Sequence, residues 1–303
     1  MIPYSIEPEE ELKIGERQVA SFIKAEKSDN IDWTTVESFG EEWEKFAHYS
    51  KDEINRMGDE YFDIVDDKIL NKESVVLDMG CGTGRWTKYA CKKAKFVEAI
   101  DPSKAVVSAA KLLEDESNIR ITQAEVSRIP FENESFDLVF SLGVLHHIPD
   151  TKEAMVSCVK KVKPNGYFLV YLYYNLDNKS FLFNILFTLS NVIRIMVCKL
   201  PKGLKQIVCD ALAILFYLPF VFLSKIAKSI FGASILKYIP LSWYHDKTWN
   251  AIRNDSLDRF GTPLEQRFSR AEIKSMMESA GLSEIKFSEH PPYWHAIGKK
   301  TML

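Results

Sequence analysis

Short apolar segments alternate with helix-like segments between residues 74 and 173, and this alternation constrains the fold more than any other feature of the chain. The apolar segments have the length and composition of buried strands. They are Ser74–Asp78, Lys95–Ile100, Ile119–Thr122, Phe136–Ser141 and Tyr167–Tyr173. Strands separated by helices in this way are typical of βαβ units, so the sequence predicts a parallel, doubly wound α/β sheet.

The pattern changes at Asn178, where the chain becomes helical in pattern, strongly apolar and basic. Between Asn178 and Leu241 there are eight basic residues and one acidic residue, a local charge of +7. The whole chain has 39 basic and 42 acidic residues, so the remainder has a charge of −10. Such an asymmetry suggests a surface partner for the basic part. The nearly balanced total gives no general attraction to nucleic acid, and we expect no nucleic-acid partner.

These patterns predict four segments along the chain. Residues 1–70 are polar, acidic and mostly helical in pattern, and we expect them to form a lid. Residues 71–177 form the ligand-binding core, and residues 178–260 form a helical insertion. Residues 261–303 return to the core with a helix, opened by the capping box of Ser269 and Glu272, and with two short strands joined as an antiparallel hairpin.

A glycine-rich turn follows the first predicted strand, with Asp78 before it and glycines at 80, 82 and 84. Glycine is needed where the backbone passes close to a ligand or adopts a positive φ. Asp101 ends the next strand, where a carboxylate can accept both hydroxyls of a ribose. The third glycine comes one residue too early for a dinucleotide fingerprint, and Asp78 would repel a pyrophosphate. The spacing therefore disfavours an NAD-dependent dehydrogenase and favours a cationic nucleoside, S-adenosylmethionine.

The stretch from Val75 to Tyr173 resembles the class I S-adenosylmethionine-dependent methyltransferases, in particular the broad subgroup that includes the ubiquinone and menaquinone biosynthesis enzymes. Five stretches carry the resemblance in the order that the family has: residues 76–84, 100–103, 129–137, 142–150 and 162–167. The resemblance implies a Rossmann-like, seven-stranded sheet whose last strand is antiparallel. It also implies a transferase that uses S-adenosylmethionine as its methyl donor.

The resemblance implies a set of cofactor-binding residues. The glycines and Cys81 would surround the methionine portion, Asp78 would order its amino group, and Asp101 would hold the ribose. Glu125 stands where the family usually has Asp, beside the adenine amino group. The full set is Asp78, Gly80, Cys81, Gly82, Gly84, Asp101, Pro102, Ser103, Glu125, Val126, Ser141, Leu142, Gly143 and Trp43. Trp43 and Tyr49 are expected either to close over the cofactor or to anchor the N-terminal segment in the core.

Two groups of residues are candidates for the chemistry. His146 and His147 follow the fourth strand and serve either as a general base or acceptor-positioning pair, or as packing residues of the turn. His245, Arg253 and Arg259, with nearby aspartates, form either an acceptor pocket or a salt-bridged surface loop. The chain has five cysteines and no Cys-x-x-Cys pair, so we expect neither a structural metal site nor a disulfide framework. This cysteine usage favours a reducing compartment.

The insertion allows several interpretations. Its uncharged run from Ala211 to Leu223 is interrupted by Pro219 and is shorter than the ~18–20 residues of a spanning helix, so we expect no span. The segment 178–241 either caps the pocket of an amphipathic acceptor, lies on an anionic membrane, or forms a homodimer interface.

The sequence thus predicts a methyltransferase acting on an amphipathic, lipid-linked or glycan-linked small molecule. The alternative is a cofactor-binding scaffold without transfer activity. Acidic residues Glu9, Glu10 and Glu11 do not fit a signal peptide, so we expect a cytoplasmic protein, free or peripheral on the inner face of a membrane.

Overall fold

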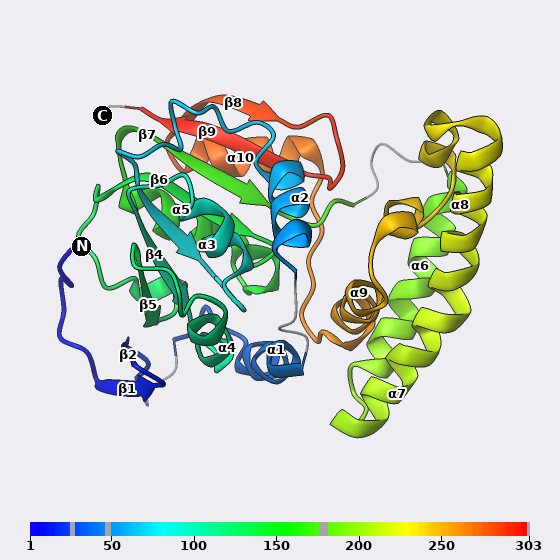
Figure 1. Cartoon of the computed structure of the whole chain (residues 1–303), viewed down its shortest axis with the longest axis horizontal. Coiled ribbons are helices and arrows are strands. Elements are labelled where there is room, and N and C mark those ends of the chain that lie inside the picture. Colours follow the sequence, from blue (N-terminus) through cyan, green and yellow to red (C-terminus); the bar gives the residue numbers. More distant parts are fainter. Residues whose placement is uncertain (25–27, 46–49, 176–180, 302–303) are drawn as a thin grey trace. The chain divides into compact units, whose positions relative to one another are not determined.

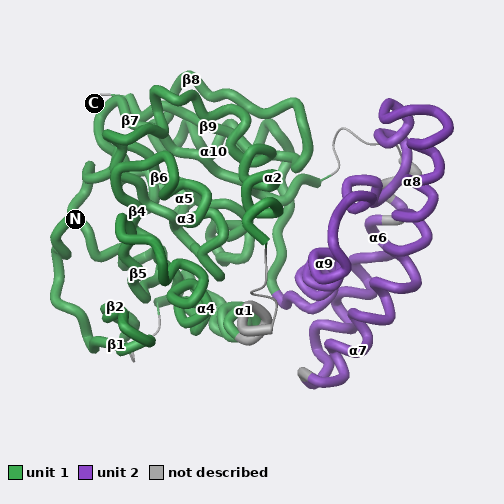
Figure 2. Tube along the Cα trace, in the orientation of Figure 1, with its two compact units in different colours: residues 1–175, 264–303 green, residues 176–263 purple. Residues whose placement is uncertain are grey.

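The computed structural model describes residues 1–24, 28–45, 50–175 and 181–301. The chain divides into two compact units (Figures 1 and 2). Unit 1 comprises residues 1–175 and 264–303, and unit 2 comprises residues 176–263. Unit 1 carries the predicted core, and unit 2 carries the apolar, basic insertion.

Unit 1 is built on a sheet that has nine strands in the described residues, in the order β1-β2-β5-β4-β3-β6-β7-β9-β8 (Figure 1). The five central strands pair in parallel, whereas β9 is antiparallel to both of its neighbours. The predicted Rossmann-like sheet with an antiparallel last strand is confirmed. The bounds are β3 (Val75–Met79), β4 (Phe96–Asp101), β5 (Ile119–Gln123), β6 (Phe136–Leu142), β7 (Val162–Tyr171), β8 (Leu282–Phe287) and β9 (His295–Lys300).

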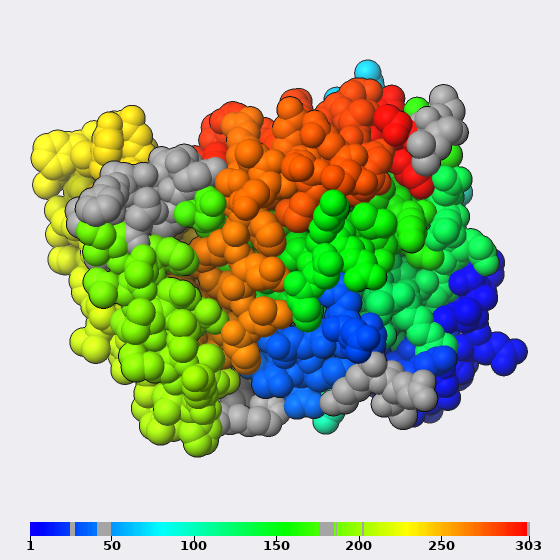
Figure 3. Space-filling view, turned by 180° about the vertical axis from the view of Figure 1, so that it is seen from behind, coloured from blue at the N-terminus to red at the C-terminus, as the bar shows by residue number. Residues whose placement is uncertain are grey.

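Helices cover both faces of this sheet, which explains why its central strands are apolar along most of their length. The helices α3 (Arg85–Ala90) and α4 (Ala105–Leu112) pack beside β4 and β5. The helices α5 (Thr151–Lys161) and α10 (Arg270–Ser279) pack on the other face, where Figure 3 shows them in green and orange. The capping box predicted at Ser269 and Glu272 opens α10.

The expectation that residues 1–70 are mostly helical was wrong for its first third. Strands β1 (Glu10–Ile14) and β2 (Arg17–Ser21) form a hairpin, and β2 pairs in parallel with β5, so the sheet has two strands more than the seven expected. Gly15, at φ +61°, makes the tight turn. The exposed acidic residues of β1 resemble a solvated helix, and only β2 buries apolar side chains. The helices α1 (Trp33–Lys45) and α2 (Lys51–Tyr61) follow.

Unit 2 is helical. It contains α6 (Phe181–Val197), α7 (Lys202–Leu212), the π-helical turn η3 (Ala213–Tyr217), α8 (Leu218–Phe231), the 3-10 segments η4 (Ala233–Tyr238) and η5 (Ser242–Asp246), and α9 (Trp249–Gly261). The elements α7, η3 and α8 follow one another without a break, so that Gly203–Phe231 is one helix of 29 residues.

The expectation that Pro219 interrupts the apolar run was wrong. Pro219 is the second residue of α8, and only Leu218 separates it from the π-helical turn, whose altered hydrogen-bond ladder tolerates a residue without an N–H nearby. The resulting helix is long and apolar enough to cross a membrane by length and composition alone. The length argument against a span therefore does not hold, although this criterion is also met by helices of soluble proteins.

A buried ion pair connects β4 to β5 in unit 1. Arg120 lies opposite Glu98 and makes two hydrogen bonds to its carboxylate, at 2.9 and 2.7 Å. The Glu98 side chain is fully buried, and burial raises its pKa to about 7 although Arg120 opposes this shift. The Arg120 guanidinium also lies 4.0 Å from the centre of the Tyr4 ring, which ties the N-terminal segment to the sheet.

Replacing Arg120 with Gln leaves the Glu98 carboxyl buried without its cation. We expect the free energy of unfolding to fall by about 3–5 kcal/mol, measured by urea denaturation at neutral pH. The control is Lys274→Gln, which removes an exposed ion pair with Glu278 and should cost less than about 1 kcal/mol. Similar small losses in both variants would contradict a supporting role for the Arg120–Glu98 pair.

Candidate cofactor site at the carboxyl edge of the sheet

The chain order places four loops at one edge of the sheet in unit 1. From β3 the chain runs outward through β4 and β5, and then returns to β6 on the other side of β3. The loops after β3 and β6 therefore leave in opposite directions, which is the position where open α/β sheets bind ligands. Asp78, Asp101, Glu125 and Ser141 lie at or just after the ends of these four strands, and the structure brings them to this edge.

The glycine-rich turn after β3 has the backbone conformation that its sequence predicts. Gly80, Gly82 and Gly84 have φ values of +81°, +53° and +83°. A Cβ on Gly80 would lie 2.4 Å from Cγ2 of Val144, so this glycine also lets the turn pack against the loop after β6. The backbone N–H groups of Gly80 and Cys81 both donate to the carbonyl oxygen of Ile100. The turn is thus held in place from both sides.

Asp78 is an acid with a strongly raised pKa. Its side chain is fully buried, and Oδ2 accepts a hydrogen bond of 2.6 Å from the Thr87 hydroxyl. Within the described residues, Oδ1 has no hydrogen-bond partner. Burial, helped by the nearby charge of Asp101, raises the pKa of Asp78 to about 7. The site therefore holds a buried carboxyl with one oxygen available for a hydrogen-bond donor.

Asp101 is held by the loops around it. Its Oδ1 accepts hydrogen bonds from the backbone N–H and the hydroxyl of Ser103, at 2.8 and 2.6 Å. Its Oδ2 accepts one from the N–H of Gly82 at 2.9 Å, which leaves that oxygen one further acceptor position. Burial raises the pKa of Asp101. The predicted contact with both ribose hydroxyls would require the Ser103 hydroxyl to turn away from Oδ1.

The remaining predicted cofactor residues line the same edge. Burial raises the pKa of Glu125, and its Oε2 has no hydrogen-bond partner among the described residues, which suits an amino donor. The Ser141 hydroxyl is already used, since it donates to the carbonyl oxygen of Met79. Burial raises the pKa of the Cys81 thiol, so this cysteine is no nucleophile. Pro102, Val126, Leu142 and Gly143 complete this edge, and Gly143 has a φ of +81°.

These features fit a cationic ligand. Two buried carboxyls, Asp78 and Asp101, lie close enough that the charge of Asp101 raises the pKa of Asp78. An anionic pyrophosphate would meet like charge at this position, whereas an ammonium or sulfonium would relieve it. The orphaned oxygens of Asp78 and Glu125 are suited to N–H donors. These acceptor oxygens therefore match S-adenosylmethionine, and the individual roles predicted for these residues stay predictions.

The two histidines after β6 differ in their surroundings. Neither ring nitrogen of His146 has a hydrogen-bond partner among the described residues, and the ring is stacked on Tyr173 with 3.9 Å between ring centres. Burial holds the pKa of His146 well below its usual value, so the ring is neutral. The Nδ1 of His147 lies 2.7 Å from the carbonyl oxygen of Leu264. Since a carbonyl only accepts, Nδ1 carries the proton, and the lone pair of a neutral His147 is on Nε2.

An aromatic row continues from these histidines along unit 1. We define it as Tyr61, Tyr171, Tyr173, His146 and His147. Ring centres lie 5.1 Å apart between Tyr61 and Tyr171 and 5.8 Å apart between Tyr171 and Tyr173. The two histidine rings lie 4.1 Å apart. The row joins α2 to the ends of β6 and β7. The residue pattern does not predict it, because its members come from segments far apart in the chain.

The predicted acceptor residues lie in unit 2. Arg253 makes two hydrogen bonds to Asp210, at 2.9 and 2.7 Å, and Nε of Arg259 lies 3.5 Å from Asp255 on the same helix, α9. Nε2 of His245 lies 2.8 Å from Nζ of Lys228. These contacts join elements of unit 2 and support the structural alternative. The acceptor-binding role stays a prediction, and α9 is a regular helix where the alternative expected a loop.

Some of the site was missed or lies outside the described residues. The side chain of Trp43 and the whole of Tyr49 are outside them, so their lid role stays a prediction. Thr87, which holds Asp78, was missed, although its position one turn into α3 from the glycines is a signal that could have found it. Ser103 was expected to bind the cofactor, and its hydrogen bonds to Asp101 were not foreseen.

The raised pKa of Asp78 predicts how stability depends on pH. Between pH ~4 and ~7 the folded protein keeps a proton on Asp78 that the unfolded chain has lost. This stabilisation is therefore fully present below the unfolded pKa and is lost as pH rises through the folded pKa of about 7. Over this range Asp78→Asn should gain about 4 kcal/mol relative to the wild type.

The measurement is urea denaturation without ligand at several pH values. The control Asp67→Asn changes an exposed aspartate and should follow the wild type at every pH. Parallel pH profiles for Asp78→Asn and the wild type would contradict the raised pKa.

Known methyltransferases resemble this chain in sequence and fold. A family model described as "Methyltransferase domain" matches residues 77–170. A ubiquinone biosynthesis O-methyltransferase from Alkalilimnicola ehrlichii is 36% identical over 114 residues, which are 37% of this chain and 46% of that protein. One from Hahella chejuensis is 32% identical over 171 residues, which are 52% of this chain and 68% of that protein. A solved S-adenosylmethionine-dependent methyltransferase from Thermotoga maritima aligns with a TM-score of 0.47 at 17% identity, covering 89% of this chain and 100% of that one.

This chain thus spans less than half of the first relative and about two thirds of the second. Both relatives are ubiquinone biosynthesis O-methyltransferases, and the family match covers the strands and loops that form the site. The sequence likeness, the strand order and the acidic edge of the sheet all point to the same family. The chain belongs to the class I S-adenosylmethionine-dependent methyltransferases.

Proposed function

We propose that this protein transfers a methyl group from S-adenosylmethionine to an amphipathic, lipid-linked or glycan-linked small molecule. The observation that carries the proposal is the buried Asp78 carboxyl, whose Oδ1 has no partner among the described residues and whose pKa is raised by burial. A carboxyl in this state, at the position where the sheet binds ligands, is suited to the amino group of a cationic nucleoside.

In this proposal the residues of unit 1 bind and orient the methyl donor. S-adenosylmethionine supplies an electrophilic methyl group on a sulfonium, whose leaving group departs neutral and needs no acid. Asp78 and the glycine-rich turn hold its methionine portion, Asp101 holds the ribose, and Glu125 accepts from the adenine amino group. The protein's further task is to align the acceptor and exclude water.

The aromatic row supports an acceptor with an apolar or planar part. Tyr171 and Tyr173 lie at and just after the carboxyl end of β7, beside the loop after β6 that carries the histidines. Aromatic rings bind planar groups by offset or edge-to-face contact. The names of the two curated relatives, which concern ubiquinone biosynthesis and O-methylation, agree with such an acceptor.

The two histidines then have separate roles. A hydroxyl acceptor must lose its proton as it is methylated. His147 is the better base of the pair, since its Nδ1–H donates to the carbonyl oxygen of Leu264 and this fixes the lone pair on Nε2. His146 is fully buried, neutral and stacked on Tyr173, which fits a packing role.

The test is the formation of S-adenosylhomocysteine together with transfer of a labelled methyl group into organic-soluble metabolites of a cell extract. Labelled product that partitions into the organic phase supports the proposal. Tight S-adenosylhomocysteine binding without any labelled product would instead favour the scaffold. Label found only in water-soluble products would contradict the amphipathic acceptor.

Binding of S-adenosylhomocysteine should release a proton near neutral pH. An ammonium beside Asp78 stabilises its ionised form, so binding lowers a pKa that starts at about 7. Affinity should rise from pH ~6 to ~8, and calorimetry in buffers of different ionisation enthalpy should show net proton release. Asp78→Asn should bind about tenfold to a hundredfold more weakly and lose this proton release. Equal proton release in both proteins would contradict the role of Asp78.

Replacing the two histidines one at a time distinguishes a general base from a residue that only packs. His147→Gln should lower kcat about a hundredfold or more, with an unchanged affinity for S-adenosylhomocysteine. His146→Phe keeps a ring against Tyr173 and should change kcat by less than about fivefold. Methyl transfer assays give both values, and thermal melts check that each variant is folded. Normal kcat in His147→Gln would contradict the assignment of the base.

A further inference from the structure

Many large apolar side chains of unit 2 are exposed. Along the helix Gly203–Phe231, the buried residues form a narrow stripe at every third or fourth position: Cys209, Ala213, Tyr217, Val221, Ser224 and Ala227. The exposed side chains are larger and apolar, and they include Ile207, Ile214, Leu215, Phe216, Phe222, Leu223, Ile226, Ile230 and Phe231. Leu215 and Phe222 are each 66% exposed. A helix of a water-soluble surface has the opposite arrangement.

The side of this helix that faces α9 carries its charged and polar contacts. Asp210 is paired with Arg253, and the Ser256 hydroxyl donates to the carbonyl oxygen of Cys209 at 2.7 Å. Lys205 donates to the carbonyl oxygen of Gly261 at 3.2 Å. Lys205 and Asp210 are the only charged residues from Gly203 to Ser224. The outward side therefore presents no charged group over about 30 Å, at 1.5 Å per residue.

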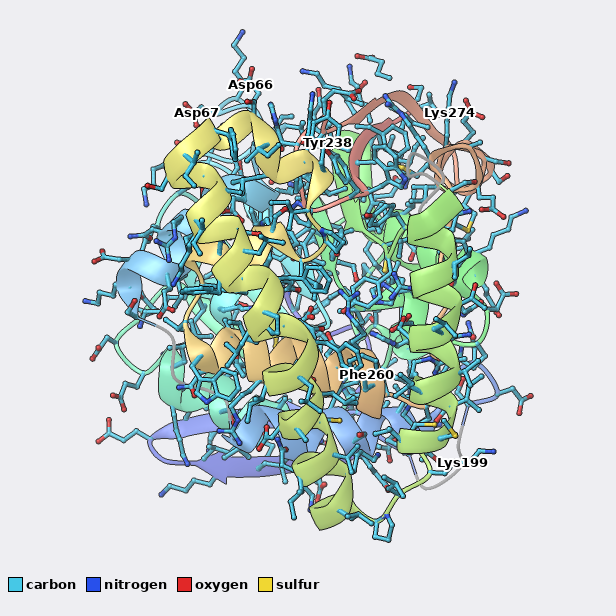
Figure 4. The ribbon with its side chains drawn as sticks, turned by 90° about the vertical axis from the view of Figure 1, so that its right-hand side faces the viewer. Asp66, Asp67, Lys199, Tyr238, Phe260 and Lys274 are labelled. Carbon is cyan, nitrogen blue, oxygen red and sulfur yellow. The ribbon has the colours of Figure 1, made fainter. Side chains whose placement is uncertain are left out.

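A second apolar stripe lies on α6. Ile185, Leu189, Val192 and Met196 are exposed at intervals of three or four residues, which places them on one side of that helix. Figure 4 shows α6 and the long helix close together at their lower ends, with α9 behind the long helix. Exposed apolar stripes of this extent are uncommon on monomeric soluble proteins and indicate an interaction surface.

Basic and aromatic side chains lie at the ends of these stripes. Lys199 follows α6, and Lys225 and Lys228 lie in the last two turns of α8, all of them exposed. Figure 4 shows Lys199 and Tyr238 at opposite ends of unit 2. Tyr238 is 66% exposed, and Nζ of Lys237 lies 4.9 Å from its ring centre. Lysines and aromatic rings at the borders of an apolar surface are typical of membrane interfaces.

We infer that the outward sides of α6 and of the helix Gly203–Phe231 bind the surface of an anionic lipid bilayer. We call this surface the apolar face of unit 2. Its side chains enter the boundary between headgroups and acyl chains, and the lysines at its ends contact anionic headgroups. This inference concerns unit 2 alone and does not depend on the proposed methyl transfer.

Two observations favour the surface of a bilayer over a second copy of the chain or a membrane-spanning arrangement. In a symmetric dimer the same patch meets itself, which would bring the lysines of the +7 segment of one copy toward those of the other. A spanning arrangement would carry α9, with Arg253, Asp255 and Arg259, into the hydrocarbon region together with Asp210, at a cost of about 2.5–3.5 kcal/mol for each charge at the centre. A helix pair lying along the surface keeps α9 in water.

The experiment is co-sedimentation of the full chain, without cofactor or acceptor, with sucrose-loaded vesicles. One set of vesicles contains phosphatidylcholine alone, and the other contains phosphatidylcholine mixed with phosphatidylglycerol. We expect binding to the anionic vesicles that is at least about tenfold stronger than to the neutral ones and that weakens with salt. Equal binding to both, or binding to neither, would overturn the inference.

The test variant is the double substitution Leu215→Glu and Phe222→Glu, at two outward positions that leave the buried stripe intact. Its control, Gln18→Glu with Ala271→Glu, makes the same change in net charge at exposed positions of unit 1. We expect the test variant to lose at least about tenfold in vesicle affinity and the control to bind like the wild type.

Thermal melts and light scattering complete the experiment. A test variant that melts like the wild type and no longer sediments with anionic vesicles supports the inference. Because a destabilised double variant would mislead, Lys199→Gln with Lys225→Gln serves as a second test and should reduce the preference for anionic vesicles. A wild-type dimer that the test variant dissociates, together with no vesicle binding by either protein, would assign the apolar face to a second copy instead.

Discussion

The burial of the Asp78 carboxyl is the interaction on which the site depends. It lies at the end of the central strand, is held by Thr87, and is raised in pKa by burial and by Asp101. Without ligand this arrangement disfavours the charged form of the acid. A ligand that brings a positive charge to the same edge relieves that cost.

Unit 2 follows a different physical rule. Its polar contacts, such as Arg253 with Asp210, face inward, and many large apolar side chains of its long helix are exposed. An amphipathic acceptor resides in a lipid bilayer, which is also the proposed binding partner of the apolar face of unit 2. The proposed methyl transfer in unit 1 and the proposed lipid contact of unit 2 therefore suit the same class of substrate, although each rests on its own residues.

The sequence predicted the core of unit 1 well because its signals are local. Strand periodicity, the glycine spacing and the capping box at Ser269 depend on neighbouring residues, and the structure has these elements within a few positions of the prediction. The N-terminal hairpin was missed because the exposed acids of β1 give no strand signal. The continuous helix through Pro219 was missed because a π-helical turn cannot be read from composition. The aromatic row and the bonds of Thr87 and Ser103 depend on tertiary contacts that residue spacing does not reveal.

The central claim is that Asp78 anchors the amino group of a cationic nucleoside at the carboxyl edge of β3. A crystal structure of the protein with S-adenosylhomocysteine tests it most directly. We expect the ligand nitrogen about 3 Å from a carboxylate oxygen of Asp78, with the ribose beside Asp101. A ligand bound elsewhere, or bound at this edge with its amino group turned away from Asp78, would show that Asp78 is not the anchor.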